Sequence, residues 1–275
     1  MLYNILMQSP LHINHFQKEA CSIMNFKLPA FCLSLLVFTS ASYGCGRKQI
    51  QLQDLPILNY TAPAEGDQII VMKIKDYGEV KIRLFPDLLP DACENFTTLA
   101  DQGYYDELIF HRVIQNFMIQ GGDPKGDGTG GESCWGGQFD GGVSDQLIHV
   151  PGALAYANSG GMTSTDGSQF YIVTGQQVDT ALLDSLVENN DMYFTPEAKN
   201  YYTQYGGAPF LDGNYTVFGQ VIDGLDIIFQ ISMTETNADD KPKKAVYIES
   251  VRTEPYDNNQ IRWYPSDYES LSGVQ

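Results

Sequence analysis

The stretch "FHRVIQNFMIQGGDPKGDGTGG", from Phe110 to Gly131, places one arginine inside an apolar run and follows it with closely spaced glycines. Arg112 has phenylalanine, valine, isoleucine and methionine close by on both sides. A charge that near a hydrophobic core costs several kcal/mol unless it has a partner or a task. The arginine therefore indicates either a structural ion pair or a functional site.

The glycines from Gly126 to Gly131 formally satisfy the dinucleotide-binding pattern G-x-G-x-x-G. That pattern binds a nucleotide only when a strand precedes it and a helix follows it. Here Asp123-Pro124 precedes it and "ESCWGGQFDGG" follows it, so neither condition holds. The chain also lacks the lysine of a phosphate-binding loop and the alternating acidic residues of a calcium loop. We interpret these glycines as tight turns beside a site.

The composition narrows the class of protein. The chain has 275 residues, 43% of them hydrophobic, which is enough for one or two domains with a real core. Its net charge of −18 leaves no basic footprint for nucleic acid, so we expect no nucleic-acid partner. Such a charge suits a solvated surface outside the cell.

The N-terminal part reads as a targeting segment. Residues 28–42, "LPAFCLSLLVFTSAS", follow Lys27 and are too few to span a bilayer comfortably, but they fit the apolar region of a signal peptide. The run ends in "SYGC", and small residues before Cys45 resemble a bacterial lipobox, although Tyr43 is large for its place. We expect residues 1–45 to be an upstream extension plus a lipoprotein signal peptide beginning at Met24.

Lipid on Cys45 would anchor the protein in the cell envelope, at the outer face of the cytoplasmic membrane or in an outer membrane. The alternatives are an ordinary signal peptide cleaved near Gly44 and a buried apolar segment. Cys93 and Cys134 remain after the leader; one disulfide is possible in an exported protein, but their spacing does not support it. No cysteine or histidine spacing indicates a metal, and we expect none.

The rest of the chain reads as one β-rich domain. Residues 46–66 are polar and predict a tether, 67–252 form the domain, and 253–275 form an unassigned tail. Many short strands with glycine-rich turns predict a sandwich or barrel. The expected strands are 68–85 as a hairpin around Asp76-Tyr77-Gly78, 110–114, 117–120, 152–157, 168–174, 215–222 and 244–251, with helices over 90–99 and 224–231.

Residues 176–209 interrupt this pattern and predict a helical insertion. Leu182, Leu183, Leu186 and Val187 lie at helical spacing and predict one apolar face, which we expect to pack near the pocket. The tyrosines of the second half are expected to present an aromatic surface to an unfolded client chain: Tyr193, Tyr201, Tyr202 and Tyr205.

The quoted stretch resembles the signature of the cyclophilins, the cyclosporin-type peptidyl-prolyl isomerases. The resemblance continues through "GALAYANSG", "DGSQFYIVTG" and "FLDGNYTVFGQVIDGLDII" and covers about residues 68–251 apart from the insertion. It implies a mainly β fold, a closed eight-stranded antiparallel barrel capped by two helices. It also implies a cofactor-independent isomerase acting on X–Pro bonds. The implied partners are proline-containing peptides and unfolded exported proteins, and the implied state is a monomer.

The resemblance assigns roles by position. Arg112 and Gln120 match the catalytic residues. The matched substrate-binding residues are Phe117, Met118, Ala157, Asn158, Gln169, Tyr171, Phe210, Leu211 and Tyr215. The chain departs from the family pattern at four places: Gln115-Asn116 replaces Pro-Gly, Tyr171 replaces phenylalanine, Phe210 replaces tryptophan and Tyr215 replaces histidine.

The chemistry explains why one arginine is enough. Rotation about the X–Pro bond has a barrier of about 18–20 kcal/mol because amide resonance must break. In the twisted state the lone pair returns to the proline nitrogen, so a donor aimed at that nitrogen favours it. Arginine stays charged and can bond two atoms at once. No proton moves, so the reaction needs no general base or nucleophile.

Two other functions fit parts of the sequence. A proline-peptide binding module with little turnover would keep the pocket, but it would not need Arg112 together with Gln120. A carbohydrate-binding β-domain would need an exposed aromatic platform, for which the sequence gives no sign. We therefore expect an isomerase that assists protein folding at the cell envelope.

Overall fold

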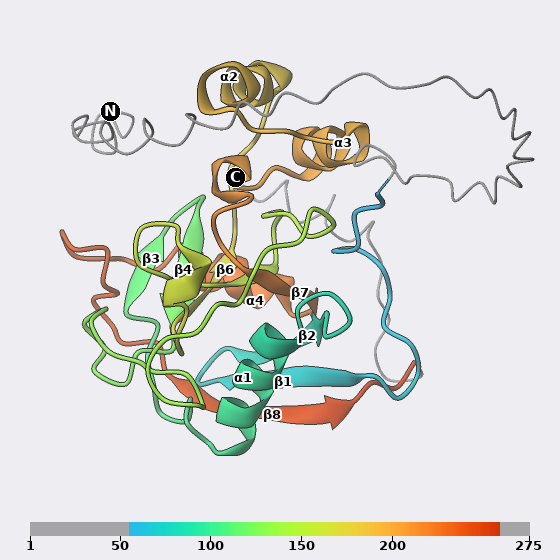
Figure 1. The fold of residues 1–275 in the computed structure, drawn as a ribbon. Coiled ribbons are helices and arrows are strands. Elements are labelled where there is room, and N and C mark those ends of the chain that lie inside the picture. The colour runs from blue at the N-terminus through green and yellow to red at the C-terminus, as the bar shows by residue number, and fades with distance from the viewer. Residues whose placement is uncertain (1–54, 259–275) are drawn as a thin grey trace, which may run out of the picture. The chain divides into compact units, whose positions relative to one another are not determined.

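The computed structural model describes residues 55–258, and their main element is one antiparallel sheet of eight strands (Figure 1). Its spatial order is β3-β4-β6-β5-β7-β2-β1-β8. This order brings the strands of the quoted stretch, β3 and β4, next to β6 and β5 from much later in the chain. The bounds are β1 (Gln68–Ile74), β2 (Gly78–Leu84), β3 (Arg112–Ile114), β4 (Met118–Gly121), β5 (Ala153–Tyr156), β6 (Phe170–Val173), β7 (Val217–Asp223) and β8 (Ile248–Pro255).

Two tight turns form hairpins, and the sequence predicts the first of them. β1 and β2 pair around the turn at Asp76 and Gly78, whose φ angles are 68° and 130°. β3 and β4 pair around Gln115-Asn116, where Asn116 has a φ of 58°. Asparagine tolerates this left-handed conformation better than most residues. The β3–β4 turn therefore forms without the Pro-Gly pair that the family pattern has there.

The sheet is a curled, open half-barrel, so the expectation of a closed barrel is only partly met. β3 and β8 are its edges, and no strand ladder joins them. The segments leading into these strands meet at one isolated bridge between Ile109 and Tyr247. Backbone hydrogen bonds from Phe110 N to Val246 O (3.0 Å) and from Ile248 N to Leu108 O (2.8 Å) flank that bridge. The ladder stays open because β3 is only three residues long and begins after this crossing.

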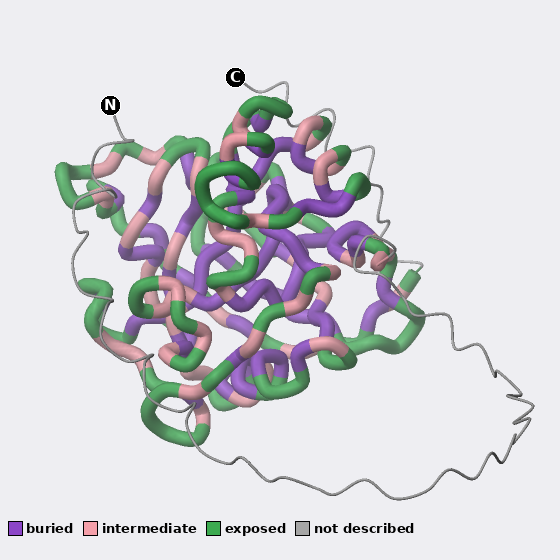
Figure 2. The backbone as a smooth tube through the Cα atoms, turned by 45° about the horizontal axis from the view of Figure 1, so that its top comes forward, coloured by how far each residue is buried: buried purple, intermediate pink, exposed green. Residues whose placement is uncertain are grey.

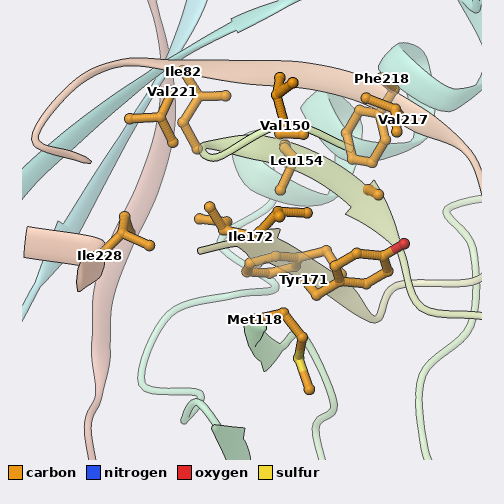
Figure 3. Packing of buried hydrophobic residues seen from close by; sticks show 14 of the residues in the cluster. Ile82, Met118, Val150, Leu154, Tyr171, Ile172, Val217, Phe218, Val221 and Ile228 are labelled. Atoms are coloured by element: carbon orange, nitrogen blue, oxygen red, sulfur yellow. The ribbon is translucent and has the colours of Figure 1, made fainter. Parts of the chain in front are cut away.

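Two helices cover the sheet, as expected. α1 (Pro90–Asp101) begins with a proline, whose missing N–H costs nothing at that position, and it contacts β7 and β8. α4 (Leu225–Ser232) contacts β2, β3 and β4. A continuous apolar core lies between helices and sheet, and Figure 3 shows part of it around Leu154, Ile172 and Phe218. Figure 2 shows the buried segments gathered in the middle of the domain, with exposed loops around them.

The insertion between β6 and β7 forms two helices that lie side by side (Figure 1), α2 (Thr180–Asn190) and α3 (Pro196–Tyr205). The side chains of Asp179 and Thr195 cap their first turns by accepting hydrogen bonds from Leu182 N and Ala198 N. A bridge between Gln176 and Gly207 closes the base of the insertion. A 3₁₀ turn, η4 (Pro209–Leu211), then leads to β7.

The apolar face of α2 is narrower than predicted. Leu183 and Leu186 are buried, Leu182 is half-buried, and Val187 is 39% exposed.

The aromatic client surface predicted for the second half of the insertion is mostly wrong. Tyr202 is completely buried, and the rings of Tyr201 and Tyr205 pack edge-on against Tyr60 at centroid distances of 5.3 and 5.4 Å. Tyr193 is the one of the four that is exposed, at 59%. The apolar rings are used to hold the insertion on the domain.

The ends of the domain reach further than the sequence pattern indicates. Residues 55–66, which we assigned to a tether, pack on the domain: Ile57 and Asn59 are buried, and Asn59 Nδ2 donates to Ile148 O and to Gln220 Oε1, each at 3.0 Å. The last strand, β8, lies four residues later than expected and runs to Pro255. Residues 1–54 and 259–275, including Cys45, lie outside the described residues.

Candidate active site

Arg112 and Gln120 face each other across the β3–β4 hairpin, and Gln120 in turn pairs with Tyr171 on β6. Directly opposed residues of an antiparallel pair project on the same face of a sheet. The three side chains therefore form one row over three neighbouring strands. This register brings together residues separated by up to 59 positions in the chain.

The row opens into a cavity of about 180 Å³. Its lining is mixed, with apolar side chains at the base and polar ones at one side. Nine of the eleven site residues that the sequence predicts line it: Arg112, Phe117, Met118, Gln120, Ala157, Asn158, Tyr171, Leu211 and Tyr215. Met118 and Tyr171 are almost fully buried, at 2% and 5% exposure, so the base of the cavity is part of the packed core.

The other two predicted residues lie against this cavity. Gln169 accepts a hydrogen bond of 3.0 Å from Gln120 Nε2 through its Oε1. Phe210 lies in the 3₁₀ turn η4 and is 38% exposed, and its ring centroid lies 5.7 Å from that of Phe117. Phe210 therefore forms an aromatic rim rather than part of the base.

The glycine loop positions Gln169. Gln169 Nε2 donates to the backbone carbonyls of Gly128 (3.1 Å) and Gly130 (2.7 Å). With both amide hydrogens engaged, its oxygen is fixed toward Gln120. The glycine loop thus acts on the site through its backbone carbonyls.

Asp123 holds the same loop in shape. Its buried carboxylate accepts backbone N–H groups from Lys125, Asp127 and Gly128, at 2.9, 3.1 and 2.6 Å. Burial alone would raise the pKa of Asp123, but these N–H donors lower it below its ordinary value. A Cβ on Gly130 would collide with the Asp123 carboxylate, which explains a glycine there.

Arg112 is half-exposed, and its one ion pair among the described residues is weak. Its Nε lies 3.6 Å from Oδ2 of Asp240, and the two side chains are 43% and 44% exposed. An exposed pair of this kind contributes about 0–1 kcal/mol. The guanidinium is therefore held near the cavity and remains available to a bound molecule.

The neighbouring histidine of the quoted stretch has no role at the cavity. His111 is buried, and neither ring nitrogen has a hydrogen-bond partner among residues 55–258. Burial lowers its pKa, which keeps the imidazole neutral.

Asn158 is oriented by a buried carboxyl group. Its Nδ2 donates to Asp166 Oδ1 at 3.0 Å, and Thr216 Oγ1 lies 2.6 Å from Asp166 Oδ2. Burial raises the pKa of Asp166 to about 6. The backbone N–H of Ala157 is already taken by Gln169 O, at 2.9 Å.

Several residues around the site escaped the sequence analysis. Asp240 belongs to a loop with no pattern, and His149 is a lone histidine before β5. Asp212 and Tyr202 lie with His149 in one hydrogen-bonded cluster behind Tyr171. The one available signal was the place of Asp212, directly after the predicted pocket residue Leu211.

A second cavity, of about 350 Å³, lies between the insertion and residues 143–148. The turn at residues 211–215 separates it from the smaller one, because Leu211 and Tyr215 line the smaller cavity and Asp212 lines the larger. Two large apolar side chains on its lining are well exposed, Val143 and Tyr193. None of the site residues predicted from the sequence lines this larger cavity.

Comparison with known proteins identifies the class. A family model described as cyclophilin type peptidyl-prolyl cis-trans isomerase matches residues 69–253. A Staphylococcus haemolyticus protein named as a peptidyl-prolyl cis-trans isomerase is 43% identical over 190 residues, which are 69% of this chain and 93% of that protein. The chain belongs to the cyclophilin family, and its activity is peptidyl-prolyl cis-trans isomerisation.

Other relatives agree. A Streptococcus pyogenes protein named as a bifunctional phosphatase and peptidyl-prolyl cis-trans isomerase is 39% identical over 218 residues; these are 78% of this chain but only 44% of that protein. A solved cyclophilin-type isomerase from Cryptosporidium parvum has a TM-score of 0.56 and 30% identity, and it covers 69% of this chain and 99% of its own. A second structure of it, in the presence of the dipeptide Ala-Pro, has a TM-score of 0.55.

Within residues 55–258, no three histidine, cysteine, aspartate or glutamate side chains are grouped so as to hold a metal ion. In the same part of the chain, no helix has the length and apolar character needed to cross a membrane. Cys93 and Cys134 are both free thiols.

Proposed function

We propose that Arg112 is the catalytic group and that the cavity beside it holds the proline of an X–Pro peptide. The observation that supports this most is the position of the half-exposed guanidinium on a cavity whose apolar lining includes Phe117, Met118 and Leu211. A proline ring in that cavity would pack its apolar faces against these apolar side chains. The amide nitrogen of the peptide then lies at the mouth, where the arginine is.

The cavity favours the twisted amide over the planar one for two reasons. Charge separation is smaller when amide resonance is broken, so an apolar wall stabilises the twisted state relative to the planar one. A guanidinium N–H also donates to the lone pair that returns to the proline nitrogen. A preorganised donor of this kind contributes about 3–4 kcal/mol, on the order of a few hundredfold in rate.

Gln120 and Gln169 orient the peptide and the arginine in this account. Their mutual hydrogen bond and the two loop carbonyls fix both amides. Asn158 supplies the edge for the peptide backbone, because its N–H makes no hydrogen bond to the residues that the structure describes. The Cryptosporidium parvum relative studied with Ala-Pro supports a proline-containing ligand.

We further propose that the protein is exported, is anchored by lipid on Cys45 and acts as a monomer on unfolded proteins at the cell envelope. The support is the apolar run ending in "SYGC" and the net charge of −18. Intact-mass spectrometry of the membrane fraction should find a diacylated Cys45 as the first residue, and Cys45→Ser should abolish that species. An unmodified mature start at another residue would contradict the anchor.

The alternative is a proline-peptide binding module with little turnover. Exchange spectroscopy by NMR separates the two, using an X–Pro tetrapeptide with the protein at about one hundredth of its concentration. At that ratio, an isomerase gives line broadening and exchange cross-peaks between the cis and trans signals of the whole peptide population. A binding module perturbs only the small bound fraction, and that result would reject catalysis.

A further inference from the structure

A buried chain of hydrogen bonds connects the helical insertion to the wall of the small cavity. Tyr202, on α3 of the insertion, donates its hydroxyl to Asp212 Oδ2 at 2.6 Å. Asp212 Oδ1 lies 2.7 Å from His149 Nδ1, and His149 Nε2 lies 2.9 Å from the hydroxyl of Tyr171. Tyr171 lines the cavity. Four residues that lie apart in the sequence therefore form one continuous hydrogen-bonded network.

The cluster is mostly buried, and a second set of hydrogen bonds holds it together. The side chain of His149 is 1% exposed and that of Asp212 is 14% exposed. The backbone N–H of His149 also donates to Tyr202 Oη and to Asp212 Oδ1, each at 3.0 Å. The rings of His149 and Tyr171 are nearly parallel, with 13° between their planes. Such a network has one strongly preferred arrangement, because each buried polar atom needs its partner.

The donors and acceptors follow from the chemistry of the groups. A carboxylate oxygen only accepts, so Asp212 selects the tautomer of a neutral His149 that carries its hydrogen on Nδ1. Nε2 is then an acceptor, and the Tyr171 hydroxyl must donate to it. Burial raises the pKa of Tyr171 well above its ordinary value, which keeps this hydroxyl protonated. The phenol hydrogen is thus directed at His149 and away from the proline site.

We propose that His149 is a positioning residue for the isomerase, that Asp212 and Tyr202 set its tautomer, and that through it the insertion holds the Tyr171 wall of the proline pocket. The inference rests on the proposed role of this cavity as the proline site. Without His149, a buried hydroxyl would be left unpaired, and it would be satisfied by moving toward the cavity and the bound peptide.

Kinetics in two backgrounds test the proposal on the full chain. We expect His149→Leu to lower kcat for an X–Pro tetrapeptide about tenfold relative to the unsubstituted protein. In the Tyr171→Phe background, we expect the same substitution to lower kcat less than about twofold relative to Tyr171→Phe alone. A histidine that merely supports the fold would cost the same factor in both backgrounds, and that outcome would overturn the proposal, as would an unchanged rate in His149→Leu.

A milder variant tests the contribution of the insertion. Tyr202→Phe keeps the ring and removes one donor to Asp212, and we expect it to lower kcat about threefold. Tyr201→Phe is the matched control on the same helix, since its ring packs on Tyr60 outside the network. Equal effects of Tyr202→Phe and Tyr201→Phe would overturn the proposed link from the insertion to the pocket.

A spectroscopic measurement covers the case in which His149→Leu does not fold. Two-dimensional ¹⁵N–¹H correlation of the histidine rings in the unsubstituted protein should show His149 with its hydrogen on Nδ1 and Nε2 as an acceptor. A hydrogen on Nε2 would overturn the proposal. If the unsubstituted protein shows this tautomer but does not isomerise the peptide, the proposed function has failed and the positioning of Tyr171 has not.

Discussion

The Nε of Arg112 lies 3.6 Å from Oδ2 of Asp240, and each of these side chains is nearly half exposed. Such a pair does not use up the charge of the arginine. The backbone carbonyl of Asp240 also accepts the N–H of Val113 at 2.8 Å, which fixes the aspartate beside β3. Arg112 could serve mainly as the partner of Asp240 or as a catalytic group. Substitution of Asp240 distinguishes these two explanations.

We predict that Asp240→Asn changes kcat/KM by less than about fivefold, because an exposed ion pair contributes about 0–1 kcal/mol. A tetrapeptide isomerisation assay measures this directly, and Asp239→Asn, one residue away in the same loop, is the control. If Asp240→Asn reduced the rate a hundredfold, the arginine would depend on the ion pair, and a purely catalytic explanation would be inadequate.

The strand order of the domain could be predicted only in outline. Alternating apolar residues and glycine-rich turns indicate each strand and both covering helices, because those signals are local. The open edge between β3 and β8 could not be predicted, since it depends on irregular hydrogen bonds between residues 108–110 and 246–248. No residue in those segments carries a turn signal that would distinguish a ladder from a single bridge.

The grouping of the predicted site residues follows from the sequence better than the residues that support them do. The eleven site residues belong to quoted motifs, and the sheet register places them around one cavity with its rim. Asp240, His149 and Asp212 were missed because a single charged or polar residue in a loop has no periodicity to reveal its partner. The aromatic surface of the insertion was misjudged for the related reason that tyrosine spacing does not show which rings meet Tyr60.

The pKa of Asp166, raised by burial to about 6, predicts a pH-dependent stability. The folded state binds its proton more tightly than the unfolded chain does, so the free energy of unfolding falls as pH rises from about 4 to about 6. The loss of stability caused by ionising the buried carboxyl group is absent below that window and complete above it, where it is on the order of 2–3 kcal/mol.

Urea unfolding of the unsubstituted protein and of Asp166→Asn at about pH 3.5 and about pH 7.5, values that bracket that window, measures this effect. We expect the free energy of unfolding to fall less between the lower and the higher pH in Asp166→Asn than in the unsubstituted protein. The contribution of His111, whose pKa burial lowers, cancels in the comparison. Asp145→Asn, which alters an exposed aspartate, is the control. Parallel pH profiles for the unsubstituted protein and Asp166→Asn would show that Asp166 does not titrate as described.

The insertion should extend the contact with long client chains through Tyr193. This side chain is 59% exposed and lines the larger cavity, on the far side of the turn at residues 211–215 from the proline site. We predict that Tyr193→Ala lowers the rate of a proline-limited protein refolding reaction about threefold and leaves tetrapeptide turnover unchanged, since one exposed aromatic contact contributes about 0.5–1.5 kcal/mol.

Met233→Ala is the control for that experiment, because Met233 is 51% exposed and lies outside the insertion. Equal losses on both substrates would place Tyr193 in the reaction centre, and no loss on the protein substrate would remove it from client binding. A single substitution is sharper here than replacing the whole insertion, since Tyr202 is hydrogen-bonded to Asp212 behind the pocket wall.

The central claim is that a guanidinium beside a proline pocket with apolar walls accelerates rotation about the X–Pro bond. The most direct measurement is kcat/KM of Arg112→Ala and Arg112→Lys for one X–Pro tetrapeptide, with circular dichroism to confirm that each variant is folded. We predict a loss of about a few hundredfold in Arg112→Ala, with little recovery in Arg112→Lys, because lysine cannot present the planar pair of donors. A folded Arg112→Ala protein that retains the original rate would contradict the account.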